Sequence, residues 1–191
     1  MDGTPKVSVI IATFNRAAFL SETLDSVMRQ KFEEFEVIVV DDGSTDDTKE
    51  VVRHYGDRIR YVFQENRGPS AARNLGVRHA RAPWLAIQDS DDLCTPDHLE
   101  VLYGYAREHS GCRMVFANGV YLGGREHNRE TIIPAGNRAG WPEKGFGWSI
   151  SLKKASCACR QLLFPNPPTT RWEAMTRISA SAWTWISPFG C

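Results

Sequence analysis

Residues 7–12 read Val7-Ser8-Val9-Ile10-Ile11-Ala12, a short and almost continuous run rich in β-branched side chains. Such a run is typical of a strand buried on both faces, as in a parallel sheet covered by helices. Further apolar runs follow at residues 35–40, 59–63 and 84–87. The segments between them carry apolar residues at helical spacing. Strands that alternate with helices predict an α/β fold with a doubly wound, mainly parallel sheet and helices on both faces.

The predicted helices have recognisable boundaries. Ser44 and Asp47 form a capping-box-like pair before one helix, which Gly56 ends. Thr95, followed by a proline, is the expected cap of a later helix. A fifth strand is predicted at residues 113–117. Beyond about residue 123 no helical or strand periodicity of apolar residues persists over a full element. We therefore divide the chain into an ordered domain at 1–122 and an irregular, poorly ordered C-terminal region at 123–191.

Composition narrows the class of protein. The chain has 191 residues, and 42% of them are hydrophobic, which is enough for one domain with a sizeable core. Its 23 basic and 23 acidic side chains cancel, so no nucleic-acid partner is expected. No apolar stretch is long enough to span a membrane, and the N-terminus lacks signal-peptide features. We therefore expect a cytoplasmic location, with peripheral membrane association left open.

The cysteines indicate free thiols. There are five of them, an odd number, and none forms a C-x-x-C pair. Without an export signal, this pattern favours neither a disulfide framework nor a zinc site.

Polar side chains follow three of the predicted strands at the point where each strand ends. They are Thr13 and Asn15, then Asp41 and Asp42, then Asp89, Asp91 and Asp92. In open parallel sheets, ligands bind beyond the carboxyl ends of the strands. Carboxylate oxygens suit Mg²⁺ or Mn²⁺, and such ions usually hold phosphates. Taken singly, each acidic group also fits a solvated turn; their recurrence at one edge of the sheet predicts a site.

Four ordered motifs carry a resemblance to a known family. They are Val7-Ser8-Val9-Ile10-Ile11-Ala12-Thr13-Phe14-Asn15-Arg16, Val39-Val40-Asp41-Asp42-Gly43-Ser44-Thr45-Asp46, Asn66-Arg67-Gly68-Pro69-Ser70-Ala71-Ala72-Arg73-Asn74-Leu75-Gly76 and Asp89-Ser90-Asp91-Asp92. Together they resemble family-2 inverting glycosyltransferases of the GT-A fold, over roughly residues 5–120. The resemblance implies transfer of a sugar from a nucleotide-sugar to an acceptor hydroxyl, and makes 1–122 the nucleotide-sugar-binding domain.

The same resemblance assigns the nucleotide-binding residues. Ala12, Thr13 and Asn15 are expected to border the nucleotide. Asp41 or Asp42 is expected to hydrogen-bond the base, with Asp42 the first choice, because a carboxylate can accept from the N3–H of uracil. A UDP-sugar is the favoured donor, with GDP- and dTDP-sugars kept open.

The resemblance also predicts the cation site. Asp91 is expected to be the main ligand of Mn²⁺ or Mg²⁺, with Asp89 near the ribose or the metal's waters and Asp92 auxiliary. Arg73 falls at the family's position near the donor diphosphate, although the residue alone would indicate a surface helix cation. We expect His98, on the helix after the acidic motif, to be solvated, with contact to the metal or a phosphate as the alternative.

The C-terminal region departs from the family. No catalytic residue is identified, because the general base expected in a later acidic motif has no equivalent beyond the isolated Glu173. Back-translation of the tail in a shifted frame allows strings that resemble the missing motifs in the right order. We therefore hypothesise that the tail is frameshifted from about Ser149. The competing interpretation is a divergent tail whose tryptophans form an acceptor or partner surface: Trp141, Trp148, Trp172, Trp183 and Trp185.

Three functions follow from these patterns. The favoured one is metal-dependent, inverting sugar transfer to a carbohydrate, lipid or protein acceptor. The first alternative is a truncated, non-catalytic nucleotide-binding fragment that lacks the base. The second is a metal-dependent phosphohydrolase, which also uses an Asp-x-Asp after a strand but places it on the first strand, whereas the motif here follows the fourth.

Overall fold

The structure is a computed structural model, and it describes residues 3–109, 114–122, 148–152 and 162–165. Its elements within these residues are β1 (Val7–Thr13), α1 (Ala17–Met28), β2 (Phe35–Asp41), α2 (Thr48–Arg53), a 3-10 helix (Gly56–Arg58), β3 (Ile59–Phe63), α3 (Pro69–His79), β4 (Trp84–Asp89), β5 (Asp92–Cys94), α4 (His98–Glu108), β6 (Val115–Phe116), β7 (Asn118–Leu122), β8 (Trp148–Leu152) and β9 (Leu162–Pro165). The main sheet has the order β3-β2-β1-β4-β9-β6, and β5, β8 and β7 form a smaller sheet.

The first four strands of the main sheet confirm the predicted parallel arrangement. β1 lies at the centre and pairs in parallel with β2 and with β4, and β2 pairs in parallel with β3. β9 pairs antiparallel with both β4 and β6. The sheet is therefore mainly parallel, as an α/β fold requires.

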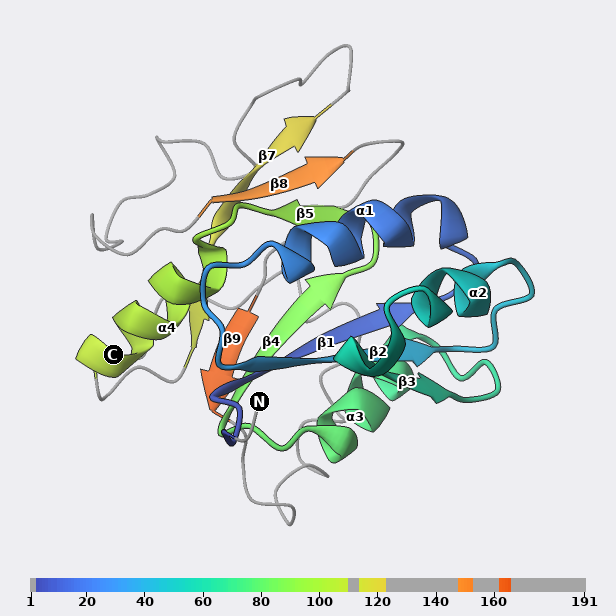
Figure 1. Cartoon of the computed structure of the whole chain (residues 1–191), viewed down its shortest axis with the longest axis horizontal. Helices are drawn as coiled ribbons and strands as arrows, with labels where there is room; N and C mark the ends of the chain where they lie inside the picture. The colour runs from blue at the N-terminus through green and yellow to red at the C-terminus, as the bar shows by residue number, and fades with distance from the viewer. Residues whose placement is uncertain (1–2, 110–113, 123–147, 153–161, 166–191) are drawn as a thin grey trace.

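Strict alternation along the strands divides the core into two layers. One face of the sheet carries the larger cluster, in which Val9, Ile11 and Val39 pack with residues of α1, α2 and α4. The opposite face carries Ile10 and Ile38, which pack in two smaller clusters with residues of α3. Figure 1 shows α1 and α2 on one side of the sheet and α3 on the other. The predicted covering of both faces by helices is confirmed.

α3 lies very close to the sheet at Gly76. A Cβ atom built on this glycine would lie 2.4 Å from the Ile10 Cγ2 atom and 3.1 Å from the Val40 Cγ2 atom. Only a residue without a side chain allows this approach, so Gly76 fixes how near the helix comes to β1 and β2.

Two helix starts differ from the prediction. The expected pair of Ser44 and Asp47 does not cap α2: no side-chain cap hydrogen bond is made at Asp47. The Asp46 carboxylate instead accepts from the backbone N–H of Thr48, at 3.1 Å, and from that of Ala17 in α1, at 3.0 Å. Burial is the largest single influence on the pKa of Asp46 and raises it, but the hydrogen bonds from Thr48 and Ala17 together lower it.

The helix expected after Thr95 begins later, at His98, with Asp97 as its N-cap residue. The helix before Gly56 also ends earlier than predicted, at Arg53.

Several strands were not predicted. β5 has three residues, and β8 and β9 lie in the region beyond residue 122, where the sequence shows no periodic pattern. The fifth strand predicted at 113–117 is present as the shorter β6. The division into domains at residue 122 stays a prediction, and most of the hypothesised frameshifted tail lies outside the described residues. Among the described helices, none is long and apolar enough to cross a membrane.

Candidate functional site

The polar groups at the strand ends meet at one edge of the main sheet. In the strand register, Ala12 lies opposite both Val40 and Asp89, and Thr13 lies opposite Asp41. The Asp42 N–H continues this contact by donating to the Thr13 carbonyl oxygen at 2.9 Å. Neighbouring strands are about 4.8 Å apart, so the ends of β2 and β4 are separated only by β1. The predicted convergence of these acidic groups is present.

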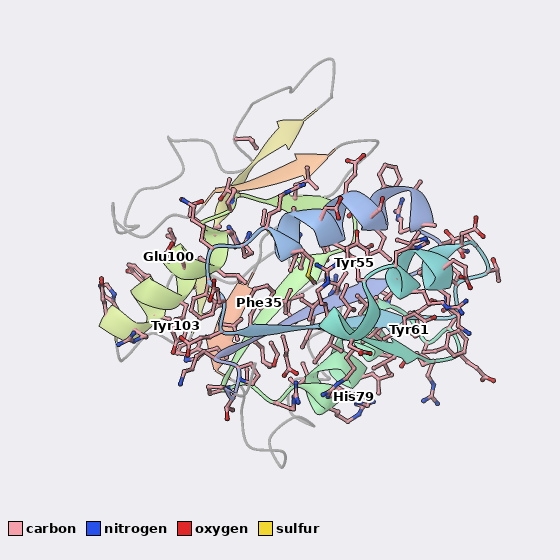
Figure 2. All side chains as sticks on the ribbon, viewed as in Figure 1. Phe35, Tyr55, Tyr61, His79, Glu100 and Tyr103 are labelled. Atoms are coloured by element: carbon pink, nitrogen blue, oxygen red, sulfur yellow. The ribbon has the colours of Figure 1, made fainter. Side chains whose placement is uncertain are left out.

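The two neighbouring aspartates after β2 have different surroundings. Asp41 is only 1% exposed, and both of its oxygens accept hydrogen bonds: Oδ1 from the Ser44 N–H at 2.8 Å, and Oδ2 from the Tyr61 hydroxyl at 2.6 Å. Burial, above all, and then the bond to Asp41 and its negative charge raise the pKa of Tyr61. Tyr61 is labelled in Figure 2. Asp41 therefore ties the turn after β2 to β3.

Asp42 faces the loop between β3 and α3. Its Oδ1 accepts from the Gln64 side-chain amide and from the Arg67 N–H at 2.9 Å, and its Oδ2 accepts from the Gly68 N–H at 2.8 Å. Gly68 is the N-cap residue of α3 and has a φ of 89°, which favours glycine. The carboxylate thus lies at the positive end of the helix dipole. Oδ2 accepts a single bond from the described residues and retains a second acceptor position.

Asn15 joins two loops at the same edge. Its φ of 51° lies in the left-handed region, which asparagine tolerates better than most residues. Its backbone N–H donates to the Ser44 hydroxyl at 2.9 Å, and its side-chain oxygen accepts from the Thr45 N–H at 2.8 Å. The structure therefore shows Asn15 fixing the loop after β1 to the loop after β2. Contact with a nucleotide stays a prediction.

Ala12 and Thr13 lie on opposite faces of β1. Ala12 packs in the cluster beneath α3, whereas Thr13 follows the alternation of Val9 and Ile11. The Thr13 side chain is 3% exposed, and its hydroxyl oxygen has no hydrogen bond within the described residues. The residues expected to border the nucleotide are thus adjacent at the edge but face different layers.

Arg73 is not an isolated surface cation. It projects from α3 to the end of β4, where its Nη2 atom lies 2.8 Å from the Asp89 Oδ1 atom. The two side chains are 26% and 31% exposed, so the pair is partly shielded from water. The helix cation that residue type alone would place at the surface instead lies at the predicted site.

The three acids of the Asp89–Asp92 motif do not form one cluster. Asp92 is 2% exposed as part of β5, and Asp89 pairs with Arg73. Asp91 is half-buried, and within the described residues its carboxylate has no hydrogen bond or ion pair. In the same part of the chain, no group of three or more His, Cys, Asp or Glu side chains is placed to hold a metal ion. The donor set fits an ion held by one or two carboxylates that completes its shell with water and phosphate, as Mg²⁺ usually does.

The expectation for His98 was wrong. It is the first residue of α4 and is fully buried, whereas a solvated position was expected. The reason is that the start of α4 is held by the segment just after α1: the Gln30 side chain donates to the Thr95 carbonyl and accepts from the Leu99 N–H.

Cys94, the free cysteine among the described residues, is also buried. Burial, with a smaller contribution from the Asp92 charge, outweighs the Ser26 hydrogen bond and raises the pKa of the Cys94 thiol to about 12. Such a thiol is unreactive at neutral pH.

A hollow of about 420 Å³ lies away from this edge, between α1 and the segment from α2 to the 3-10 helix. It is lined by Ser21, Asp25, Val51, His54, Tyr55 and Arg58. None of the predicted donor-site residues lines it, so this hollow is not part of the predicted donor site.

Comparison with known proteins identifies the family. A family model described as glycosyl transferase family 2 matches residues 8–159 of this chain. The chain belongs to glycosyl transferase family 2. It is similar to a validoxylamine A glucosyltransferase of Streptomyces hygroscopicus, with 51% identity over 102 residues that cover 50% of this chain and 24% of that protein.

Solved structures support the GT-A fold of this member of glycosyl transferase family 2. TarS 1-349 of S. aureus in complex with UDP has a TM-score of 0.53 and 31% identity, over 61% of this chain and 35% of that one. The mannosyltransferase PcManGT of Pyrobaculum calidifontis, in complex with GDP-Man and Mn²⁺, has a TM-score of 0.56 and 30% identity, over 61% and 36%. The chain therefore spans about a quarter to about a third of the length of these three proteins.

Sequence reasoning missed several residues that shape this edge of the sheet. Tyr61 and Gln64 hold the two aspartates from β3 and the loop after it. Thr23 and Gln88 hold the backbone around Asp91. The sequence around these four residues carries no signal for the contacts. A single polar residue among apolar ones gives the same pattern whether its side chain is solvated or is buried and hydrogen-bonded.

Proposed function

We propose that this chain binds a nucleotide-sugar, with a UDP-sugar as the first choice, and transfers the sugar to an acceptor hydroxyl with inversion, in a reaction that depends on a divalent cation. The observation that carries the proposal is the placement of Asp42, Arg73, Asp89 and Asp91 along one edge of the sheet. Family membership and the likeness to a UDP complex support it. A GDP-sugar remains the second donor, because the similar mannosyltransferase is in complex with GDP-Man.

Asp42 is our choice for recognition of the base. Its carboxylate is held in place by donors on both oxygens, and the free acceptor position on Oδ2 suits the N3–H group of uracil. Asp41 is the second choice, because its carboxylate turns toward Tyr61 and Ser44 and holds the turn after β2. Asn15, Thr13 and Ala12 complete the proposed border of the nucleotide.

Asp91, with Asp89 beside it, is our choice for holding Mn²⁺ or Mg²⁺. When bound, such an ion neutralises the negative charge that develops on the departing diphosphate. Arg73 contributes a guanidinium suited to phosphate oxygens, and its ion pair with Asp89 keeps it at the site before any donor arrives. Asp92 stays the auxiliary carboxylate of this proposal, and its side chain is 2% exposed in β5.

In the proposed reaction the acceptor oxygen attacks the anomeric carbon from the side opposite the diphosphate. The bond between that carbon and the diphosphate oxygen breaks, and the nucleoside diphosphate leaves with its electron pair. A general base removes the acceptor proton. We assign no described residue to that role. The acceptor is proposed to be a carbohydrate, lipid or protein, and a cytoplasmic location stays a prediction.

The proposal is tested by measuring the melting temperature of the 191-residue chain with UDP, GDP and dTDP, each with and without Mn²⁺. A ligand that binds only the native state raises the melting temperature. We expect the largest rise with UDP and Mn²⁺ together. Asp91→Ala should abolish the part of the rise that depends on Mn²⁺, whereas Asp57→Ala, which removes an exposed acid from the 3-10 helix, should not.

Two results would contradict the proposal. The first is the absence of any nucleotide-dependent rise, and the second is an Asp91→Ala variant that responds to Mn²⁺ as the unmodified chain does. Hydrolysis of a UDP-sugar by the chain, measured as release of UDP, would add direct support.

A further inference from the structure

Two buried polar side chains of α1, and a third just beyond its C-terminal end, form a row beside β5 and the start of α4. Thr23, Ser26 and Gln30 follow one another at helical spacing and are 0%, 3% and 8% exposed. Figure 1 shows α1 running beside β5. Buried polar groups in proteins are nearly always hydrogen-bonded, so the partners of this row reveal what it holds.

The row bonds to the backbone of the segment that contains and follows the acidic turn. The Thr23 hydroxyl donates to the Ser90 carbonyl oxygen at 3.0 Å, and the Ser26 hydroxyl oxygen accepts from the Cys94 N–H at 3.1 Å. Gln30, just after the end of α1, bonds to the backbone at the start of α4. α1 and Gln30 together thereby fix the course of the chain from Ser90 to the start of α4.

Gln88 holds the same turn from inside β4. Its side chain is 1% exposed, and its amide nitrogen donates to the Asp92 carbonyl at 3.0 Å and, less directly, to the Asp89 carbonyl at 3.3 Å. Its side-chain oxygen accepts from the Cys94 thiol at 3.1 Å. Thr23 therefore bonds to the middle of the turn, while Gln88 bonds to both of its ends.

We infer that Thr23 and Gln88 are positioning residues for the Asp91 carboxylate. Within the described residues that carboxylate makes no hydrogen bond or ion pair of its own, so its place is set by the backbone that carries it. The backbone carbonyls on either side of Asp91, those of Ser90 and Asp92, accept from Thr23 and Gln88. Loss of either bond lets the turn move, and Asp91 with it.

This inference rests on the proposed function, because it concerns the cation that the nucleotide would bring to Asp91. Residues that orient a metal ligand without touching the metal commonly change metal affinity by about 10- to 100-fold when they are replaced. A residue with a purely structural role would instead lower the melting temperature and leave the cation requirement unchanged. The two roles are therefore separated by the Mn²⁺ dependence.

The experiment measures UDP binding by calorimetry across a series of Mn²⁺ concentrations, and bound Mn²⁺ directly by electron paramagnetic resonance. The test variants are Thr23→Val, which keeps the shape and removes the hydroxyl, and Gln88→Met, which keeps the length and removes the amide. Thr23→Ser restores the hydroxyl. The matched control is Ser8→Ala, which removes a fully buried hydroxyl near the N-terminal end of β1, far from the acidic turn. The Ser8 hydroxyl donates to Glu36 and accepts from the Ala82 N–H.

We expect Thr23→Val and Gln88→Met to raise the half-saturating Mn²⁺ concentration by about 10-fold or more. Their UDP affinity without Mn²⁺ should stay within about twofold of the unmodified chain, and Thr23→Ser and Ser8→Ala should keep the original Mn²⁺ requirement. If one test variant does not fold, the other decides. An unchanged Mn²⁺ requirement in the folded test variants overturns the inference. Absence of UDP binding, or of any Mn²⁺ effect, in the unmodified chain overturns the proposed function first, and the inference with it.

Discussion

The pair Asp41 and Asp42 shows how adjacent identical residues acquire different roles. Successive side chains of an extended segment point to opposite sides, so Asp41 turns to Tyr61 and Ser44, and Asp42 to the start of α3. Both carboxylates accept from donors of the fold on each oxygen, Asp41 two bonds in all and Asp42 three. Strand alternation therefore decides which segment of the chain each aspartate meets.

Tyr61→Phe tests this separation. The variant removes the hydroxyl donor to Asp41, and a hydrogen bond to a charged group typically contributes about 1.5–3 kcal/mol. We expect the free energy of unfolding, measured by urea denaturation, to fall by about that amount, while UDP affinity by calorimetry changes little. A variant of unchanged stability, or one that loses UDP binding while folded, would contradict the assignment of Asp41 to structure.

At the N-terminal ends of the strands, opposite the candidate site, Glu36 joins β1, β2 and the segment after α3. It accepts from the Ser8 hydroxyl at 2.7 Å, and from the backbone N–H and the Nε of Arg81 at 2.7 and 2.8 Å. Burial acts most strongly on the pKa of Glu36 and raises it. The Ser8 and Arg81 hydrogen bonds, with the Arg81 charge, outweigh burial and lower the pKa below the ordinary value of 4.5.

Because the folded-state pKa is lowered, Glu36 stabilises the protein above pH 4.5, and this contribution is lost as the pH falls through the folded-state pKa. Glu36→Gln should therefore reduce the free energy of unfolding at pH 7 by about 1–3 kcal/mol, with the difference shrinking below about pH 4. Urea denaturation across this pH range checks it. The control is Glu50→Gln, since Glu50 is 56% exposed in a surface pair with Arg53; an equal loss in both variants would refute the prediction.

Among the elements, α3 is the one whose distance from the sheet is set by a single residue. Gly76→Ala places a methyl group 2.4 Å from Ile10 Cγ2, so the helix or the strand must shift. Overpacking of this kind typically costs about 1–3 kcal/mol. Because α3 also carries Arg73, we expect a lower melting temperature together with weaker UDP binding.

Gly104→Ala is the matched control for this prediction. Gly104 lies within α4, and a Cβ atom there would meet nothing within 4 Å. Alanine in a helix interior is favoured over glycine by about 0.5–1 kcal/mol, so this variant should melt at a higher temperature. If Gly76→Ala is also stabilising, the close approach of α3 is not a constraint on the fold.

The elements also show where prediction from sequence succeeds and where it stops. Strands β1, β2 and β4 are predictable because each is buried on both faces over most of its length and is therefore mainly apolar. β3 is less buried but keeps its β-branched and aromatic residues. β5 and β6 have three and two residues, too few to show any period. Helix starts were misplaced because polar residues near them bond elsewhere, as Ser44 does with Asn15.

The sequence predicted where in the sheet the candidate site lies, but not the hydrogen-bond partners of its residues. Strand ends with polar residues in a parallel sheet must lie together, and this placed Asp41, Asp42 and Asp89 correctly relative to one another. Their partners were not predictable, because Gln64 and Arg73 lie on other segments and reach the edge only through side-chain geometry. The burial of His98 likewise depends on the contacts that Gln30, just after α1, makes with the start of α4.

For the molecule as a whole, the origin of the C-terminal tail is testable on the gene. The family model matches as far as residue 159, while the hypothesised frameshift begins at about Ser149. We expect that sequencing codons 140 to 191 will reveal an added or missing base, and that its correction will restore an acidic motif suited to a general base. An unbroken frame that related genes share would refute the hypothesis and favour a genuine divergent tail.

The position of β9 has a practical consequence for anyone who shortens the chain. β9 covers the backbone of Trp84–Ile87 on the side of β4 away from β1. Removal of residues from Leu162 onward would leave these N–H and C=O groups without that neighbour, on a strand of strongly apolar character. An exposed apolar edge strand can pair with a strand of another molecule and so promote aggregation. Trimming the protein to its most regular part would therefore turn β4 into an exposed edge strand. Aggregation, rather than loss of nucleotide binding, would be the first effect to appear.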